Sequence, residues 1–190
     1  MARWEPNAPE RLSRAALELF EERGYENTTV IDIAARAGLT KSTFFRHFQD
    51  KREVLFGGST LAGLLADAIA DAIADAPETA SPLEAVACAM DAVGRAVFTA
   101  ERREFSARRR AVIAAHPELR EREALKGVAL IEAVTGALRA RGVPELSACV
   151  AAELGALAMK IGYERWIEVG GEFGGTARRT LEEVRAAVER

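Results

Sequence analysis

Helical periodicity runs through almost the whole chain, and no long segment alternates with the period of two that a half-buried strand requires. Between Leu12 and Phe20, apolar residues recur at the i, i+3, i+4, i+7 and i+8 positions of a single helix face. Glycine and proline separate such segments and do not fill them. The pattern therefore predicts an all-α protein of about nine helices.

Three helices with clear start and stop signals are predicted near the N-terminus. The first covers about 9–23, and Gly24 supplies a left-handed stop. The second begins after Thr29, which with Asp32 has the spacing of a capping box. The third begins after Thr40, and Gly38 provides the tight turn between the second and third helices. Two short helices joined by a tight turn, with another helix beneath them, predict a helix-turn-helix.

The predicted third helix holds three phenylalanines in five residues, within "GLTKSTFFRHFQDK". Phe44 and Phe48 are four residues apart and share a face, so we expect both in the core. Phe45 is turned about 100° away from them and cannot join that face. Lys41 lies four residues before Phe45 and shares its outward direction.

Positive charge is concentrated in this same region. The net charge of the chain is −3, so any nucleic-acid contact must come from a local patch. Residues 28–52 contain five basic and two acidic side chains, whereas residues 1–27 contain four basic and six acidic ones. Free backbone N–H groups in the first turn of the third helix also favour phosphate. The pattern indicates a DNA-recognition helix.

The segment "RLSRAALELFEERGYENTTVIDIAARAGLTKSTFFRHFQDKREVL" resembles the N-terminal domain of the tetracycline-repressor (TetR) family of bacterial transcriptional regulators. The resemblance implies an all-helical homodimer, paired through helices eight and nine, that binds double-stranded operator DNA. It further implies a C-terminal domain that binds a small-molecule effector. We accordingly expect a helix-turn-helix domain over 1–50 and a helical ligand-binding and dimerisation domain over 51–190.

The resemblance also implies which residues meet DNA. Base or groove contacts are expected from Lys41, Ser42 and Thr43, and phosphate contacts from Thr29, Phe45, His47 and Lys51. Phe45 departs from the family, which usually has Tyr there, so only an apolar contact is available, with a thymine methyl or a sugar. The alternatives are extra core packing for Phe45, a partly buried histidine for His47 and a solvated lysine for Lys51.

The predicted helices beyond residue 50 are longer. The fourth begins after the cap Asp50 and contains Gly57 and Gly58, which serve either close packing or a soft joint between the domains. Ser81 and Glu84 form a second predicted capping box, and "GGEFGG" is predicted to be a loop. The expected ranges from the fourth helix onward are 51–76, one opening at 81–82, 101–115, 117–142, 144–169 and 176–189.

The predicted helix over 144–169 has two apolar faces, and both must be buried. One side can meet its own domain and the other a partner subunit, and the last helix offers a further seam to that partner. The first face holds Val150, Leu154, Leu157 and Ile161, the second Met159, Tyr163 and Trp166, and the seam Ala177, Leu181, Val184 and Val188.

Effector contacts are expected from large apolar or aromatic residues of the C-terminal half and from one or two arginines of the run "ERREFSARRRAVI". Ordinary core packing, and a solvated face for the arginines, are the alternatives. A guanidinium group matches an anionic ligand, and residues 102–168 weakly resemble mycofactocin-system repressors, for which fatty acyl-CoA is a known effector class. The effector is therefore unknown, either apolar or an acyl-CoA-like anion. The candidates are Met90, Phe98, Phe105, Arg109, Met159, Tyr163 and Trp166.

Other functions have less support in the sequence. The two histidines have no metal-ligand spacing and no glycine-rich phosphate loop is present, so we expect no metal, no cofactor and no enzyme activity. Cys88 and Cys149 are expected to be reduced in a cytoplasmic protein, and no membrane span is expected. A small helical enzyme and a DNA-organising protein without an effector are the alternatives. An internal apolar cavity would favour a ligand-responsive regulator over the DNA-organising protein.

Overall fold

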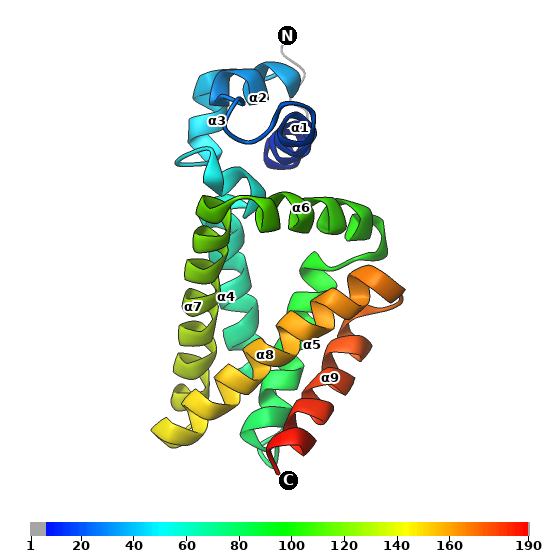
Figure 1. Ribbon diagram of the computed structural model, residues 1–190. Helices are drawn as coiled ribbons and strands as arrows, with labels where there is room; N and C mark the ends of the chain where they lie inside the picture. Colours follow the sequence, from blue (N-terminus) through cyan, green and yellow to red (C-terminus); the bar gives the residue numbers. More distant parts are fainter. Residues whose placement is uncertain (1–6, 190) are drawn as a thin grey trace. The chain divides into compact units, whose positions relative to one another are not determined.

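The computed structural model describes residues 7–189, and the side chains of residues 59 and 60 are outside the description. Within that range the chain is helical and contains no strand (Figure 1). The α-helices are α1 (Ala8–Arg23), α2 (Val30–Arg36), α3 (Lys41–His47), α4 (Gly58–Ala74), α5 (Pro82–Val97), α6 (Arg103–Ala115), α7 (Pro117–Ala140), α8 (Glu145–Val169) and α9 (Phe173–Val188). Two 3₁₀ helices, η1 (Arg52–Leu55) and η2 (Ala100–Arg102), complete the list. The all-α prediction is confirmed.

The chain folds as two compact units. The head unit comprises residues up to Gly63 together with Ala107–Glu123, and the C-terminal unit comprises Leu64–Ser106 and Ala124–Arg190. Helices α4, α6 and α7 each contribute residues to both units. The head unit thus includes a segment from the middle of the chain. A single domain boundary at residue 50 would assign that segment to the C-terminal domain.

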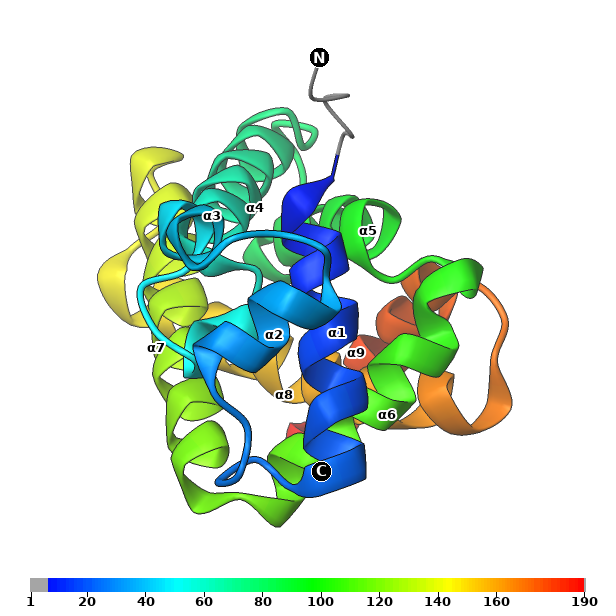
Figure 2. The ribbon, with the colours of Figure 1, turned by 90° about the horizontal axis from the view of Figure 1, so that it is seen from above.

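In the head unit, α1 packs against α2, α3 and η1 (Figure 2). The predicted buried face of α1, from Leu12 to Phe20, lies in the core as expected. Gly24 has φ 83° and its N–H donates to the Phe20 carbonyl. The Tyr25 ring then folds back onto Phe20, with ring centroids 5.1 Å apart. Short-range sequence signals therefore predicted both the face and the end of this helix.

The single fourth helix predicted over 51–76 is wrong. Asp50 does cap the next turn, since its Oδ1 accepts the N–H groups of Arg52 and Glu53 at 2.8 and 3.1 Å. That turn is the short η1, however, and α4 begins only at Gly58. Gly57 and Gly58 have φ values of 77° and 69°, which an α-helix interior cannot contain. The two glycines therefore make the break between η1 and α4.

The C-terminal unit is built on α5, α8 and α9, which pack against one another. Ser81 and Glu84 form the predicted capping box at the start of α5. Two glycines of α8 allow close approach: a Cβ at Gly155 would lie 2.5 Å from Val86, and one at Gly162 would lie 3.2 Å from the Ala177 Cα. Small residues on α8 therefore set how closely these helices pack.

Two predictions about α9 are wrong. The predicted loop "GGEFGG" is partly helical, because α9 begins at Phe173 and the Glu172 carboxylate accepts the Gly175 N–H at 2.9 Å. Phe173 is buried, which draws this segment into the core. The predicted intersubunit seam of Ala177, Leu181 and Val184 is also buried within its own unit, so only Val188 of that set is exposed.

Helix α8 is the one described helix that is long and apolar enough by length and composition to cross a membrane. A core helix of a soluble protein passes the same test. Its glycine face packs on α5 and α9, and Glu153 and Lys160 interrupt its length. These features are those of a helix that packs within the C-terminal unit.

Candidate nucleic-acid interface

Two side-chain caps define the ends of the helices that flank the turn. Thr29 accepts the Asp32 N–H at 3.2 Å, and Asp32 Oδ2 accepts the Thr29 N–H at 2.9 Å. The hydrogen bonds from the Thr29 hydroxyl and backbone lower the pKa of Asp32. Thr40 accepts the Thr43 N–H at 3.1 Å, and Gly38 adopts φ 65° in the turn. The predicted caps and the turn glycine are confirmed, and together they set the direction of α3.

The three phenylalanines of α3 and its C-cap separate as predicted. Phe44 and Phe48 are 0% and 2% exposed, with ring centroids 5.4 Å apart. Phe45 is 48% exposed. Core packing therefore does not account for Phe45. The Lys41 ammonium lies 5.9 Å from the centre of the Phe45 ring, so the two side chains share the outward face of α3.

Some basic side chains of this region form ion pairs and others do not. Arg36 is bound to Glu18 and Glu22 of α1, and Arg52 to Asp50. By contrast Lys41 and Arg46 are exposed and form no ion pair with any residue that the structure describes. Sequence analysis did not single out Arg46 as a candidate; its place beside Phe45, outside the core spacing of Phe44 and Phe48, was the available signal.

The side-chain nitrogens of Lys51 and His47 are turned toward the protein and not toward solvent, where their predicted phosphate contacts would lie. Lys51 Nζ donates to the Tyr25 carbonyl at 2.7 Å and lies 3.9 Å from the centre of that ring. The His47 Nε2 atom is buried and has no hydrogen-bond partner among the described residues. Burial, with a smaller effect of Arg46, lowers the pKa of His47. Contact with phosphate through these two atoms would need each side chain to turn outward.

The remaining predicted DNA contacts lie on or near the first turns. Thr29 and Ser42 are exposed, whereas Thr43 is half-buried and its hydroxyl lies 3.0 Å from that of Thr40. Ser42 stands in the first turn of α3, beside Lys41. Lys41, Ser42, Phe45 and Arg46 therefore form the accessible outer surface of α3.

Residues 107–123 hold the head unit through several long-range contacts. Arg122 is hydrogen-bonded to the carboxylate of Glu53, which is 3% exposed. Arg108 Nε donates to Glu21 Oε1 at 3.0 Å. The Tyr25 hydroxyl lies 3.4 Å from Glu118, and burial, followed by the Glu118 charge, raises the pKa of Tyr25. The N-terminal helices of the head unit thus contact a segment that is distant from them in the sequence.

Arg109 contacts residues of the head unit and does not lie with the other predicted effector residues. Its Nε donates to the Leu55 carbonyl at 2.6 Å, and its guanidinium lies 4.9 Å from the centre of the Phe56 ring. It also lies 3.7 Å from Glu123. Local contacts in the head unit therefore occupy this side chain.

Three of the predicted effector residues do come together in the C-terminal unit. Phe98 lies 5.4 Å from Tyr163 and 5.8 Å from Trp166 between ring centroids, and Phe173 joins them at 4.3 Å from Phe98. The Tyr163 hydroxyl donates to the Ser106 carbonyl at 3.0 Å. Trp166 is fully buried and donates to the Gly171 carbonyl at 3.0 Å.

The other predicted effector residues have different surroundings. Met90 is buried, Met159 packs partly buried against the same core, and Phe105 is half-buried. The aromatic cluster of Phe98, Tyr163, Trp166 and Phe173 is therefore the part of the predicted set that forms a group. Among the side chains that the structure describes, no group of three His, Cys, Asp or Glu is placed to hold a metal ion.

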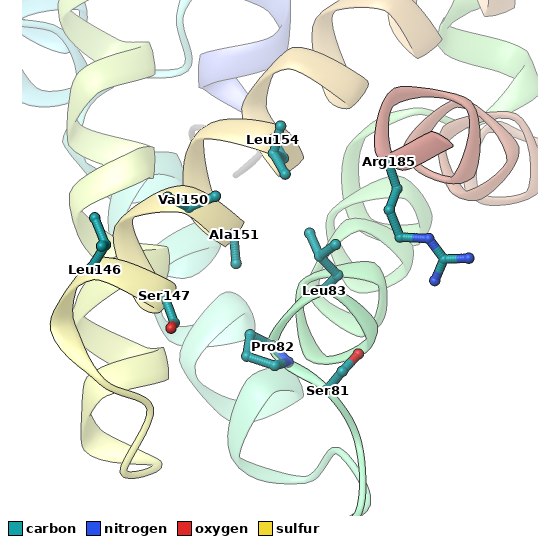
Figure 3. A pocket seen from close by; sticks show the side chains of 9 residues that line it. All are labelled: Ser81, Pro82, Leu83, Leu146, Ser147, Val150, Ala151, Leu154 and Arg185. Carbon is teal, nitrogen blue, oxygen red and sulfur yellow. The ribbon is translucent and has the colours of Figure 1, made fainter. Parts of the chain in front are cut away.

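A groove of about 520 Å³ lies elsewhere in the C-terminal unit, between the starts of α5 and α8 (Figure 3). Its walls are mainly apolar, and Arg185 of α9 stands at one side. None of the predicted effector residues lines it. The lining consists of Ser81, Pro82, Leu83, Leu146, Ser147, Val150, Ala151, Leu154 and Arg185. A smaller hollow of about 320 Å³ is bordered by Phe98 and Phe173 of the aromatic cluster.

Two capped helices joined by a tight turn, with exposed basic side chains and an exposed phenylalanine on the outer face of the second helix, are typical of a DNA-binding helix-turn-helix protein. Residues 12–56 match the profile of the bacterial regulatory proteins of the tetR family, and this match supports a transcription regulator of that family.

The chain is 40% identical over 84 residues to the transcriptional regulator TcmR of Streptomyces glaucescens, a match that covers 44% of this chain and 36% of TcmR. It is 37% identical over 49 residues to the mycofactocin biosynthesis regulator MftR of Mycobacterium tuberculosis, covering 26% of this chain and 25% of MftR. The chain thus matches well under two thirds of the length of these relatives.

The fold extends the likeness over the whole chain. SmeT, the repressor of the Stenotrophomonas maltophilia multidrug efflux pump SmeDEF, superposes with a TM-score of 0.59 at 18% identity. The match covers 96% of this chain and 90% of SmeT. At this level of identity the likeness concerns the fold, an N-terminal helix-turn-helix followed by a helical C-terminal region.

Proposed function

We propose that this protein is a dimeric transcriptional repressor whose operator affinity changes when a small molecule binds the C-terminal unit. The observation that carries the DNA-binding part is the outer surface of α3. There Lys41, Phe45 and Arg46 are exposed while Phe44 and Phe48 anchor the helix from behind. A cytoplasmic location follows from this role.

The contacts of α3 divide into base-reading and phosphate-binding groups. Lys41 and Ser42, with Thr43, are proposed to face base edges, and Arg46, with Thr29, His47 and Lys51, the phosphates. Lys41→Ala should cost about 1–3 kcal/mol on the operator and little on random DNA. Arg46→Ala should weaken both DNAs similarly and reduce the salt slope. Equal losses of Lys41→Ala on operator and random DNA, measured by fluorescence anisotropy across a salt series, would contradict its reading role.

The exposed face of α8 supports the dimer. Val150 and Leu157 are 49% and 45% exposed, and Leu146 continues the same face toward the start of the helix. A second copy would cover these side chains, with α9 contributing from its exposed residues. The operator should then be a near-palindrome whose recognition helices lie about 34–36 Å apart, or a multiple of that.

The oligomeric state provides the test of this interface. Leu157→Glu should give a monomer by size-exclusion chromatography with light scattering, because an unpaired charge would be buried. Leu125→Glu is a matched control, since Leu125 on α7 is 55% exposed and lies outside the proposed interface. A Leu157→Glu protein that remains a folded dimer would exclude this face.

The hollow of about 320 Å³ that Phe98 and Phe173 of the aromatic cluster border supports an effector that is apolar or carries an acyl chain, including an acyl-CoA-like anion. A ligand present at 100 times its Kd should stabilise the protein by about 2.7 kcal/mol, so thermal shift with fatty acyl-CoA and free CoA is the direct screen. Phe98→Ala should abolish the shift if the cluster binds, and Leu83→Ala should abolish it if the groove binds. An effector-independent DNA-organising protein predicts no shift with any compound.

A further inference from the structure

Phe45 is exposed at a place where the rest of the head unit hides its large apolar side chains. Among the described residues of that unit, Ile31 and Phe45 are the large apolar side chains that remain exposed, and both lie in the helix-turn-helix. Phe44, the neighbouring ring, shows that α3 can bury a phenylalanine completely. The Phe45 ring meets the Phe44 ring edge-on, with ring centroids 5.5 Å apart, and the Lys41 ammonium lies over it at 5.9 Å. About half of the ring remains exposed beside Lys41 and Arg46, on the face of α3 that is proposed to meet DNA.

The chemistry of that contact is narrow. A phenyl ring has no hydrogen-bonding group, so it cannot bind a phosphate oxygen or the polar edge of a base. In the major groove the apolar group on a base edge is the C5-methyl of thymine. Resting on the proposed DNA-binding function, we propose that Phe45 determines operator specificity by packing on a thymine methyl in each half-site.

Lys41 fixes where that thymine should lie. The Lys41 ammonium is 5.9 Å from the centre of the Phe45 ring, on the same face of α3. Base pairs are spaced about 3.4 Å along the duplex. The thymine should therefore lie within about two base pairs of the base that Lys41 contacts, since both side chains reach into the groove from one helix face.

Replacement of thymine by deoxyuridine removes only the methyl group and is the sharpest probe. A binding site is first selected from random duplex DNA with the full-length protein. Each thymine of that site is then replaced by deoxyuridine, symmetrically in both half-sites, and the Kd is measured by anisotropy. At one position, wild-type affinity should fall about fourfold per half-site, the effect of one lost buried methyl.

Phe45→Ala should lower affinity for the thymine site and make the protein insensitive to deoxyuridine at that same position. Arg46→Ala is the matched control on the neighbouring residue: it should weaken binding on every DNA yet keep the deoxyuridine effect. Because Phe45 lies outside the core, circular dichroism and light scattering of Phe45→Ala should match the wild type.

The outcomes separate this inference from the function on which it rests. Failure to select any DNA would overturn both. Selection of a site at which no thymine is sensitive, or at which Phe45→Ala keeps the full deoxyuridine loss, would overturn the role of Phe45 alone. A Phe45→Ala loss of equal size on selected and random DNA would assign the ring to a sugar and would also overturn it.

Discussion

The helices around the turn and the helices of the C-terminal unit are specified in different ways. Helices α2 and α3 have seven residues each, and the start of each is set by the residue just before it, Thr29 or Thr40, which accepts an N–H of the first turn. Helices α8 and α9 are longer, and what decides their faces is the packing between them and α5. Local signals are therefore a reliable guide in the first region, whereas in the second the same apolar residue can face a core or a partner.

Removal of the Trp166 side chain should have the largest effect, because long-range packing dominates the C-terminal unit. Trp166 is fully buried among Phe98, Tyr163 and Phe173. Trp166→Ala should destabilise the protein by about 3–5 kcal/mol in urea unfolding followed by circular dichroism. Tyr163→Phe, which removes only one hydroxyl, is expected to cost about 1 kcal/mol. Similar effects of the two changes would contradict a tightly packed cluster.

Arg122→Met tests whether the head unit also depends on distant sequence. The change leaves the buried Glu53 carboxylate without this guanidinium, which should cost about 3 kcal/mol. The double variant Glu53→Gln with Arg122→Met should recover part of the loss, because the buried charge is gone. A cost below about 0.5 kcal/mol for the single change, near the level of ordinary surface substitutions, would mean that local signals suffice for the head.

Gly58→Ala should cost about 2 kcal/mol or more. Gly58 has φ 69°, and a Cβ there would lie 2.6 Å from the His47 carbonyl oxygen. Gly63→Ala in the same helix is the matched control: no neighbour lies within 4 Å of its Cβ position, so it should stabilise by about 0.5–1 kcal/mol. Alanine at Gly58 therefore strains the backbone before it stiffens any joint between the units.

Loss of a single cap should have a smaller effect. Thr40→Ala removes the acceptor of the Thr43 N–H and should cost about 1 kcal/mol. Thr40→Ser keeps the oxygen and should retain most of the stability. If both changes were equally harmful in thermal unfolding, the methyl group and not the cap would be the reason for threonine there.

The smallest expected effect is that of His47 on pH dependence. Because burial lowers its pKa in the folded protein, the unfolded chain binds the proton first as the pH falls below about 6.5. Stability should therefore decrease from pH 7 toward pH 5, and less so in His47→Asn. Identical pH profiles of the melting temperature for the two proteins would show that the enclosure of His47 is energetically silent.

The sequence alone determined the all-α class, the helix-turn-helix and the separation of Phe45 from Phe44 and Phe48. These depend on contacts between residues at most about four positions apart, which any isolated segment contains. Tertiary structure decided that Arg109 binds Leu55 and that Ala177, Leu181 and Val184 face their own core. It also decided that Gly57 and Gly58 break a helix. An apolar stripe or an arginine in the sequence indicates only that the side chains need a partner. Which partner they contact depends on residues far away in the chain that the fold brings near.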